Sequence, residues 1–410
     1  MTGPDAVTEK TKVMETQGLA VGYGTRTVVA DINQEMLKGQ FVCLLGPNGS
    51  GKTTILRSLS RLLSPLKGAI YLDGRMLCDL APHELARSLA VVLTERLSPG
   101  LVTAFEFVAM GRYPYTDFLG RLSEQDVEKI QESLRLVNAT DIADRYFNEL
   151  SDGERQKVLV ARALAQEPEV IILDEPTVHL DLKHRIEIMS ILRDFCRKKE
   201  ITVIVSLHDV DLALKISEIV VLVKDGAIMA WGPPDEVLKE GTVARLYDLD
   251  CARFDRKLGT IELINSSNGR TAFVVAGGGT GTPIYRILSR SGLRLMTGVI
   301  HENDIDYHIA RSIGATVIYE KSFKKIKNGR LRRSIALLGK TNHVIDSGFP
   351  IGSSNRRNLI LILNAVEEGK RVYTLRSRKA AHNLYGESAE KLIYCGGCRS
   401  ILEEIMYRET

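Results

Sequence analysis

The sequence lacks the features that mark several protein classes. No apolar run approaches the roughly 18 residues of a membrane-spanning helix, so none is expected. The opening stretch, MTGPDAVTEKTKVMETQG, has no apolar centre and is not expected to be a secretory signal. The 6 cysteines are scattered and form no disulfide framework, which favours a reducing compartment. With 44% hydrophobic and 26% charged residues, the chain is not globally disordered either.

Length and charge together favour two domains. A chain of 410 residues exceeds one ordinary hydrophobic core. Residues 260–410 carry 23 Lys and Arg against 13 Asp and Glu, whereas residues 1–259 carry 32 against 38. This asymmetry favours two domains with different surfaces, although unevenly distributed solvated charge also accounts for it.

The stretch QFVCLLGPNGSGKTTILRSLSRLL fits the phosphate-binding pattern G-x-x-x-x-G-K-[ST]. A predicted strand precedes it and an amphipathic helix follows, so backbone N–H groups of the glycine loop can point at phosphates. Lys52 can reach the β and γ oxygens, and the Thr53 hydroxyl can ligate Mg²⁺. The predicted ATP-binding loop comprises Gly46, Pro47, Asn48, Gly49, Ser50, Gly51, Lys52, Thr53 and Thr54.

A second motif, EVIILDEPTVHLDL, supplies the acids that hydrolysis needs. Residues 170–173 are predicted to form a strand beside the glycine-loop strand in a parallel sheet. Asp174, at its end, can hold the Mg²⁺ shell, and Glu175 is placed to polarise the attacking water.

Together with these two motifs, three further stretches carry a resemblance to a known family. They are LSDGERQKVLVARALAQEP, VIVSLHDVDLAL and LAVGYGTRTVV. Over residues 13–255 the sequence resembles the ATP-binding subunit of an ABC transporter. The resemblance implies a P-loop α/β cassette with a helical subdomain. It also implies that Tyr23 stacks on adenine, that His208 senses the γ-phosphate, and that Asp181 lies in the D-loop. With Lys52 and Glu175, His208 forms the implied catalytic set.

The resemblance also implies a signature loop that acts on the ATP of a second chain. Ser151 and Gly153 open a helix whose N–H groups can bind an anion. The implied assembly is a head-to-tail homodimer that ATP closes and hydrolysis releases. The implied signature loop comprises Ser151, Asp152, Gly153 and Glu154.

The segment VAMGRYPY (residues 108–115) resembles one found in importers of iron–siderophore, haem and cobalamin, where it docks onto a permease. A generic helix and turn is the alternative. The implied partners are a transmembrane permease and an extracytoplasmic binding protein, and the implied place is the cytoplasmic face of the cell membrane, peripherally attached. Two other functions stay open: a soluble ABC-type ATPase acting on nucleic acid or the ribosome, and a ligand-sensing module tethered by the cassette. No nucleic acid is expected, because the chain has neither two cassettes nor a long coiled coil.

Three positions depart from the family pattern. Glu95 stands where a glutamine is usual; its carboxylate can still coordinate Mg²⁺ but cannot donate an amide hydrogen bond. The signature loop carries Asp152 and Glu154 where glycine and glutamine are usual. We expect altered ATP affinity rather than loss of the site.

Residues 260–410 predict a second, doubly wound, Rossmann-like α/β domain of no family that we can name. We expect strands at 271–276, 294–300, 315–319, 342–346, 370–375 and 391–394, with helices at 283–291, 304–313 and 355–368. Its glycine loop fits neither a dinucleotide pattern nor a second phosphate-binding lysine loop. It could bind a small anionic ligand, or the glycines could serve tight turns only. The candidate residues are Gly278, Gly279, Thr280, Gly281, Thr282 and Glu302.

Two other features of this domain are weaker. Residues 320–334 carry seven basic residues and could face anionic lipid headgroups, although a solvated helix face also explains them. Phe323 is the only aromatic residue in this stretch, so stacking on single-stranded nucleic acid is poorly supported. Cys395 and Cys398 form one Cys-x-x-Cys pair without the further ligands that zinc would need.

Overall fold

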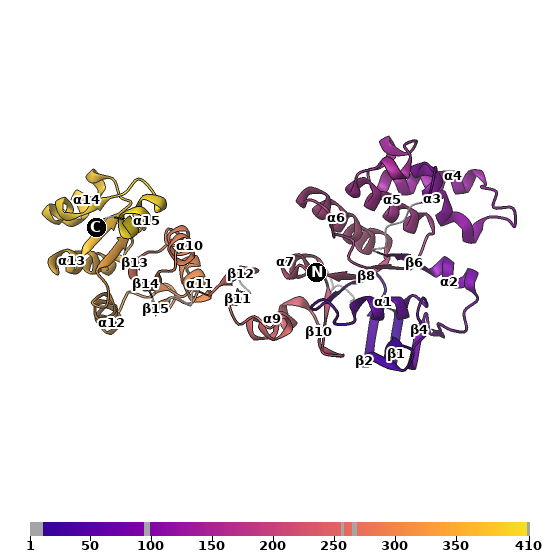
Figure 1. The fold of residues 1–410 in the computed structure, drawn as a ribbon, viewed down its shortest axis with the longest axis horizontal. Helices are drawn as coiled ribbons and strands as arrows, with labels where there is room; N and C mark the ends of the chain where they lie inside the picture. Colours follow the sequence, from indigo (N-terminus) through magenta and orange to yellow (C-terminus); the bar gives the residue numbers. More distant parts are fainter. Residues whose placement is uncertain (1–10, 94–98, 256–257, 265–268, 408–410) are drawn as a thin grey trace, which may run out of the picture. The chain divides into compact units, whose positions relative to one another are not determined.

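The chain folds into two compact units, Met1–Leu238 and Lys239–Thr410 (Figure 1). The computed structural model describes residues 11–93, 99–255, 258–264 and 269–407. In its described part no helix is long and apolar enough to cross a membrane.

The first unit is built on a six-stranded sheet with the order β10-β9-β3-β8-β7-β6. Its strands are parallel except for the β9–β10 pair. Every residue of β3, β7 and β8 is buried, as is typical of parallel strands covered on both faces. The strands are β3 (Phe41–Leu45), β6 (Leu89–Val92), β7 (Val170–Leu173), β8 (Thr202–Leu207), β9 (Ile219–Lys224) and β10 (Ala227–Gly232).

A four-stranded antiparallel sheet with the order β2-β1-β4-β5 shares a hydrophobic core with the parallel sheet and α1. Its strands are β1 (Lys12–Tyr23), β2 (Arg26–Leu37), β4 (Lys67–Leu72) and β5 (Arg75–Met76). The helices beside the two sheets are α1 (Lys52–Leu59), α2 (Pro82–Ser88), α6 (Leu182–Lys199), α7 (Val210–Ile216) and α8 (Pro234–Val237).

The expected helical subdomain lies between β6 and β7 in the sequence. Helices α3 and α4 both pack on α5, so the three form one bundle (Figure 1). Its elements are α3 (Ala104–Ala109), the 3₁₀ helix η1 (Met110–Tyr115), α4 (Glu124–Leu136), η2 (Thr140–Ile142), η3 (Phe147–Glu149) and α5 (Asp152–Ala165).

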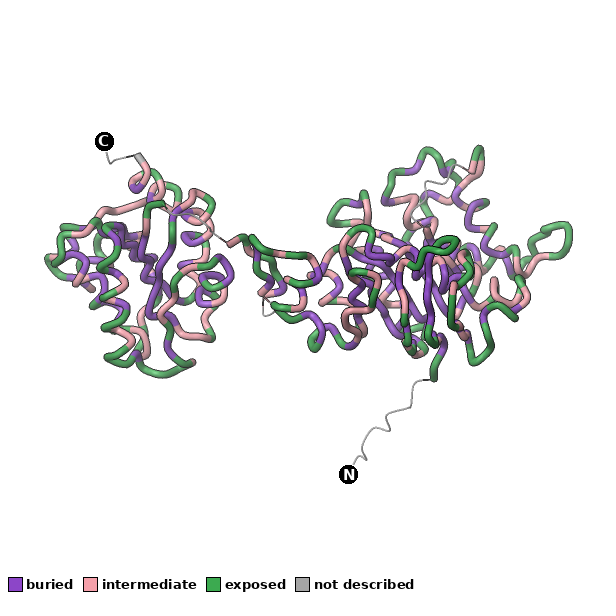
Figure 2. Tube along the Cα trace, turned by 60° about the horizontal axis from the view of Figure 1, so that its bottom comes forward, coloured by how far each residue is buried: buried purple, intermediate pink, exposed green. Residues whose placement is uncertain are grey.

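The second unit is built on a six-stranded, wholly parallel sheet with the order β15-β14-β13-β16-β17-β18. One hydrophobic core holds side chains of α10, α11 and α15, and another holds those of α12, α13 and α14, so helices cover both faces. Figure 2 shows the buried sheet inside exposed helices. The strands are β13 (Thr271–Val275), β14 (Arg294–His301), β15 (Thr316–Glu320), β16 (His343–Asp346), β17 (Arg371–Thr374) and β18 (Ile393–Tyr394).

A short hairpin and helix α9 (Glu240–Tyr247) precede this sheet. The hairpin pairs β11 (Ala252–Asp255) with β12 (Thr260–Leu263), and α9 and α11 pack on β11. This pairing places residues 239–255, which the sequence analysis assigned to the first domain, in the second unit. The other helices are α10 (Thr282–Arg290), α11 (Ile305–Ser312), α12 (Asn328–Leu338), η4 (Arg356–Asn358), α13 (Leu359–Glu367), α14 (Arg378–Tyr385), η5 (Gly386–Lys391) and α15 (Cys398–Tyr407).

All six strands and three helices expected in the second unit are present within a few residues of their predicted bounds. Helices α12, α14 and α15 were not predicted. The apolar side of α12 carries Leu331, Ile335 and Leu338 at helical spacing, but the basic residues between them obscure the pattern.

Candidate functional site

The glycine loop between β3 and α1 follows a path that only glycine allows. Gly51, the N-cap of α1, has a φ of 105°, and a Cβ there would lie 2.4 Å from the Val29 side chain. A Cβ on Gly46 would lie 2.2 Å from the Val223 carbonyl oxygen. Because Gly46 and Gly51 have no side chains, the loop can pack closely against β9 and β2.

Two polar groups of this loop suit an anionic ligand. Lys52 is only 5% exposed, and its Nζ donates to the carbonyl oxygens of Gly46 at 2.8 Å and Pro47 at 3.1 Å. Burial lowers the pKa of Lys52, opposed by the nearby carboxylates of Glu175 and Asp174. The Ser50 hydroxyl is buried and bonds to no described group. A phosphate would satisfy this hydroxyl and pair with the ammonium group, so the residues present fit the phosphates of ATP.

The glycine loop, Tyr23 and Glu175 all line one cavity of about 420 Å³. The fold thus brings Tyr23, the glycine loop and Glu175, which are separated in the sequence, to one cavity. The cavity also includes two residues that the sequence analysis did not assign, Arg26 and Val28, which follow Tyr23 across a turn. The lining residues are Tyr23, Arg26, Val28, Asn48, Gly49, Ser50, Gly51, Lys52, Thr53, Thr54 and Glu175.

The two acids after β7 are held by groups of β8 and the loop that follows it. Ser206 Oγ donates to Asp174 Oδ1 at 2.6 Å and accepts from the Glu175 backbone N–H at 2.8 Å. His208 Nε2 lies 2.5 Å from Glu175 Oε1. Asp174 is 6% exposed, and Glu175 has a φ of 49°, which turns its side chain into the cavity. The structure therefore brings Glu175 and His208 into contact, and Ser206 fixes both acids.

Ser206 is a residue of the candidate site that the sequence analysis missed. It is a lone hydroxyl in the apolar run VIVSL, and β8 is hydrogen-bonded to both β3 and β7. A polar side chain near the end of a fully buried strand was the available signal.

The signature loop forms a capping box at the start of α5. Ser151 Oγ accepts from the Glu154 backbone N–H, while Glu154 Oε2 accepts from the Ser151 N–H and hydroxyl, each at 2.8 Å. The Ser151 backbone and side-chain donors hold the pKa of Glu154 below its ordinary value. Arg145 Nη1 also lies 3.0 Å from the other carboxylate oxygen. The carboxylate of Glu154 thus satisfies part of a helix terminus that was expected to receive a phosphate.

Gly153 and the D-loop meet at His184. A Cβ on Gly153 would lie 2.6 Å from the His184 ring, so this position has no room for a side chain. The same ring places Nδ1 2.8 Å from Asp181 Oδ1, and Asp181 caps α6 by accepting from the His184 N–H at 2.9 Å. Within one chain, His184 of α6 therefore connects the signature loop to Asp181 of the D-loop. Glu95, the other departure from the family pattern, lies outside the described residues.

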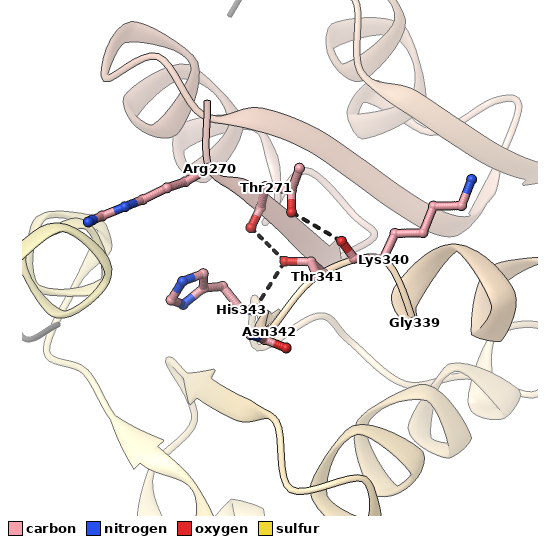
Figure 3. A pocket seen from close by; sticks show the side chains of 7 residues that line it. All are labelled: Arg270, Thr271, Gly339, Lys340, Thr341, Asn342 and His343. Carbon is pink, nitrogen blue, oxygen red and sulfur yellow. Dashed lines mark hydrogen bonds between the residues drawn. The ribbon is translucent and has the colours of Figure 1, made fainter. Parts of the chain in front are cut away.

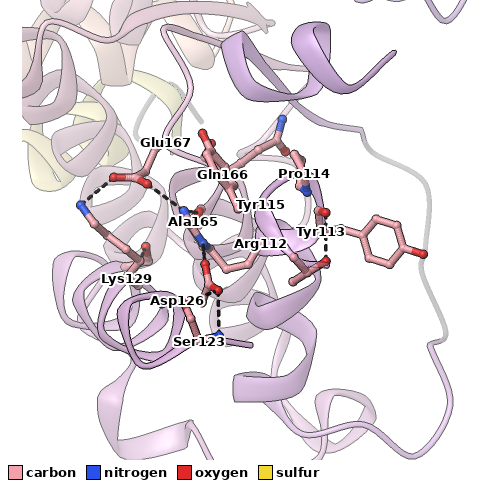
Figure 4. A network of polar contacts seen from close by, with 12 residues as sticks. Arg112, Tyr113, Pro114, Tyr115, Ser123, Asp126, Lys129, Ala165, Gln166 and Glu167 are labelled. Atoms are coloured by element: carbon pink, nitrogen blue, oxygen red, sulfur yellow. Dashed lines mark hydrogen bonds and ion pairs between the residues drawn. The ribbon is translucent and has the colours of Figure 1, made fainter. Parts of the chain in front are cut away.

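The segment 108–115 is anchored by a buried cation. Arg112 is 4% exposed; its Nε donates to Asp126 at 2.8 Å, and its Nη1 donates to Glu167 at 2.8 Å and to the Ala165 carbonyl at 2.7 Å. The guanidinium lies 4.0 Å from the centre of the Tyr115 ring (Figure 4). Tyr113, in contrast, is 77% exposed and points away from this network. Arg112 and Tyr115 therefore anchor the segment, whereas Tyr113 is free to contact another molecule.

Several large apolar side chains of the helical subdomain are exposed near this segment in the sequence. They are Leu101, Met110, Tyr113, Phe118, Leu119 and Leu122.

The glycine loop of the second unit is already bonded to carboxylates of the same chain. Asp306 accepts from the N–H groups of Gly281 and Thr282 at 3.0 and 2.7 Å, and from the Thr282 hydroxyl at 2.8 Å. Asp304 accepts from the Gly278 N–H at 2.6 Å. A bound anion would have to displace these carboxylates.

Two other candidate residues of this site, Thr280 and Glu302, bond to different loops. Thr280 Oγ1 lies 2.7 Å from Ser347 Oγ, which joins the loops after β13 and β16, where ligands bind in parallel α/β sheets. The carboxylate of Glu302 instead accepts from the Ser322 N–H at 3.4 Å. The anion site stays a prediction, and Asp306 is the residue that the sequence analysis missed there.

A different cavity in the second unit, of about 270 Å³, lies at the amino ends of β13 and β16 (Figure 3). The Thr341 hydroxyl in its wall donates to the Thr271 carbonyl at 2.5 Å and accepts from the His343 N–H at 3.1 Å. These bonds tie two strand ends together, so we assign the lining hydroxyl a structural role.

Cys395 and Cys398 have raised thiol pKa values because both are partly buried. Among the described residues no group of three His, Cys, Asp or Glu side chains could hold a metal. Burial disfavours the thiolate form of both cysteines.

Comparison with known proteins agrees with this geometry. Residues 29–178 match the family model described as ABC transporter, and residues 295–402 match the MJ0874 family. An uncharacterised ABC transporter ATP-binding protein of Methanocaldococcus jannaschii is 46% identical over 70% of this chain and 99% of its own length. The ferric enterobactin transport ATP-binding protein of Escherichia coli is 35% identical over 65% of this chain and 98% of its own length.

A probable siderophore transport system ATP-binding protein of Bacillus subtilis is 36% identical, over 63% of this chain and 94% of its length. Among solved structures, a putative metal-chelate type ABC transporter superposes with a TM-score of 0.52 at 27% identity, over 57% of this chain and 88% of that chain.

Proposed function

This chain belongs to the ABC transporter ATP-binding proteins, the ATPase subunits of transport systems, and on that premise we propose that it powers an importer as a head-to-tail homodimer. The observation that carries the proposal is the cavity in which Tyr23, the glycine loop and Glu175 meet. This cavity could hold a nucleotide with its terminal phosphate next to the Glu175 carboxylate.

The chain's own residues bind and orient ATP. Tyr23 stacks on the adenine, and the N–H groups of the loop cradle the phosphates. Lys52 exchanges its bonds to the Gly46 and Pro47 carbonyls for the β and γ oxygens. Because Lys52 is buried, its charge is poorly screened and acts strongly on the phosphates.

Thr53 and Asp174 would hold Mg²⁺, since a hydroxyl and a carboxylate are the hard oxygen ligands that this ion prefers. The ion would neutralise charge that develops on the phosphates. Ser206 would hold the Asp174 carboxylate in place for this role by donating to its Oδ1 atom.

Glu175 accepts the proton of the attacking water as a general base. His208, 2.5 Å away, fixes its carboxylate and senses the γ-phosphate. The chain contains one phosphate-binding loop with a Gly-Lys-Thr sequence and one signature loop, so a pair of chains completes two ATP sites. Ser151 and Gly153 act on the partner's ATP, while Glu154 and Asp152 reduce the positive potential there and tune the ATP affinity.

The exposed apolar residues around Tyr113 form the docking surface for a membrane permease. Arg112 holds that surface in place from beneath. The cargo is an iron–siderophore, haem or cobalamin, because relatives at 35–36% identity carry the names of siderophore and ferric enterobactin transport. An extracytoplasmic binding protein completes the complex, and the chain sits peripherally at the cytoplasmic face of the membrane.

The second unit is a Rossmann-like domain that regulates the ATPase. Its strand order, 3-2-1-4-5-6, is the doubly wound order whose ligands bind beyond the carboxyl ends of the strands. A small anionic ligand would enter there by displacing the carboxylates of Asp304 and Asp306.

The test is Glu175→Gln in the chain copurified with its permease. Loss of a general base lowers the ATPase rate by about 10²- to 10⁴-fold, and uptake of iron–siderophore into proteoliposomes stops while ATP binding is retained. Glu124→Gln, an exposed acid at the start of α4, is the matched control and leaves both rates unchanged. Copurification of ribosomes or DNA in place of a multi-spanning permease would contradict the importer and favour the nucleic-acid alternative.

A further inference from the structure

The ATPase mechanism proposed above does not use a strongly basic surface on the second unit. Residues 321–340 contain eight Lys and Arg and no Asp or Glu. We name residues 321–333, the loop after β15 and the first half of α12, the basic surface. Its exposed cations are Lys321, Lys324, Lys325, Lys327, Arg332 and Arg333.

The neighbouring carboxylates of Glu320 and Glu302 offset only part of the charge of the basic surface. Lys321, Lys324, Lys325 and the two exposed arginines form no ion pair with any residue that the structure describes. Solvated protein surfaces usually intersperse both signs of charge. Uncompensated charge of one sign is what attracts a polyanionic partner.

The tip of the loop carries an exposed aromatic residue. Phe323 is 85% exposed and has a φ of 59°, a conformation that bulky side chains rarely adopt. The Lys324 N–H donates to the Lys321 carbonyl at 3.2 Å, and His301 Nε2 lies 2.8 Å from the Lys324 carbonyl oxygen. The fold therefore holds Phe323 outward by contacts on both sides of it.

The base of the loop is fixed as well. The buried carboxylate of Glu320 accepts from the N–H groups of Lys321 at 3.1 Å and Lys327 at 3.2 Å. Arg357 Nη1 donates to the Ile326 carbonyl at 2.7 Å. These contacts order the loop before any partner arrives, which reduces the conformational entropy that binding would cost.

Helix α12 extends the same surface. Ser334 and Leu338 are buried, and Leu331 and Ile335 pack against a core of the second unit. Arg332 and Arg333 are exposed in the same helix, while Arg330 lies 5.3 Å from the centre of the Tyr319 ring. The helix thus has an apolar inner side and a basic outer side.

We propose that the basic surface binds the face of an anionic phospholipid bilayer, with Phe323 entering the interface and the cations resting on headgroup phosphates. Burial of apolar area and electrostatic attraction to anionic lipid together set the strength of attachment to a membrane surface. Nucleic acid fits less well, because strand binding relies on several stacking aromatics and the basic surface has one. This attachment needs neither ATP nor a permease, so it goes beyond the proposed function.

The test is cosedimentation of the full chain with vesicles of phosphatidylcholine alone or with about one third phosphatidylglycerol. We expect binding only to the anionic vesicles, weakening as salt rises. Each cation near the membrane contributes about fivefold to partitioning. The triple variant Lys321→Gln, Lys324→Gln, Lys325→Gln should therefore lose about 100-fold.

The matched control removes the same charge elsewhere in the second unit. Arg290→Gln, Lys379→Gln, Lys391→Gln changes three exposed cations outside the basic surface and should keep the wild-type partitioning. Phe323→Trp should add a fluorescence that shifts to shorter wavelength on anionic vesicles, above the background of Trp231.

Several results would overturn the proposal. They are equal binding to neutral vesicles, equal losses in the two triple variants, an unshifted fluorescence of the Phe323→Trp variant, or binding to an oligonucleotide without binding to vesicles. Glu175→Gln should bind vesicles like the wild type, so failure here and failure of the ATPase proposal are separate outcomes.

Discussion

Ser206 holds Asp174 and Glu175 in place through a hydroxyl that no motif includes. It donates to Asp174 and accepts from the backbone N–H of Glu175, at 2.6 and 2.8 Å. Both acids therefore depend on one side chain that is fully buried in β8. Positioning of this kind decides whether the carboxylates face the phosphates before ATP arrives.

Ser206→Ala should lower both stability and activity. A buried N–H left without a partner costs about 1–3 kcal/mol of unfolding free energy. Activity or Mg²⁺ affinity should fall by about 10- to 100-fold, the usual effect of losing a group that orients a metal ligand. Urea titration and a Mg²⁺-dependent ATPase assay measure the two effects.

The control is Ser58→Ala in α1, whose equally buried hydroxyl bonds to no described group. It should leave stability and turnover near the wild-type values. Wild-type turnover in Ser206→Ala would show that the hydroxyl has no positioning role.

Helix α5 begins with a capping box whose strength depends on pH. The Ser151 donors hold the pKa of Glu154 below its ordinary value of 4.5. A carboxyl with a depressed pKa in the folded state stabilises the fold above its unfolded pKa, and this contribution is lost as pH falls through the folded pKa.

Glu154→Gln keeps an acceptor for the Ser151 N–H but removes the titration. The stability difference between the wild type and this variant should therefore be constant near pH 6–7 and shrink as the pH falls below about 4.5. Denaturant unfolding across this range measures it. A pH-independent difference for Glu154→Gln would contradict the account.

In the segment 108–115, two adjacent residues have different environments. Arg112 is buried and anchors the segment, whereas the Tyr113 side chain is exposed. Arg112→Met should cost about 3–5 kcal/mol of unfolding free energy, because Asp126 is left buried without its cation. Tyr113→Ala, at a side chain that is 77% exposed, should change stability by less than about 0.5 kcal/mol.

For transport, Tyr113→Ala should have a large effect although its effect on stability is small. Tyr113→Ala should copurify poorly with the permease and uncouple uptake from ATPase activity while its unfolding curve stays unchanged. Wild-type copurification and uptake in Tyr113→Ala would show that Tyr113 is not part of the docking surface.

At the scale of the whole molecule, the sequence predicted best where chemistry is local. The phosphate-binding loop is one continuous stretch whose glycines are required by nearby backbone atoms, so its pattern was sufficient. Ser206, Asp306 and His184 act on residues 24 to 32 positions away, and only the fold brings those residues together. For the same reason, the glycine loop of the second unit resembled an open anion site until its amides proved to be bonded to Asp304 and Asp306.

The two units also differ in what their elements reveal. In the first unit, a recognisable motif follows each of β3, β7 and β8, so these strands could be predicted from the motifs. In the second, charge obscured the helical spacing of α12, and α15 has only Ile401 and Ile405 as fully buried positions among its described residues. Helices without a motif at their ends were the elements most easily missed.

The central claim is that each ATP site needs the signature loop of a second chain. Mixing two inactive variants tests it: Lys52→Ala has a disabled phosphate-binding loop, and Ser151→Asp keeps a helix cap but places negative charge against the partner's γ-phosphate. Each alone should be nearly inactive. An equal mixture should recover about a quarter of the wild-type ATPase rate, since half of randomly formed dimers hold one intact site. A mixture no more active than the variants alone would contradict the composite site.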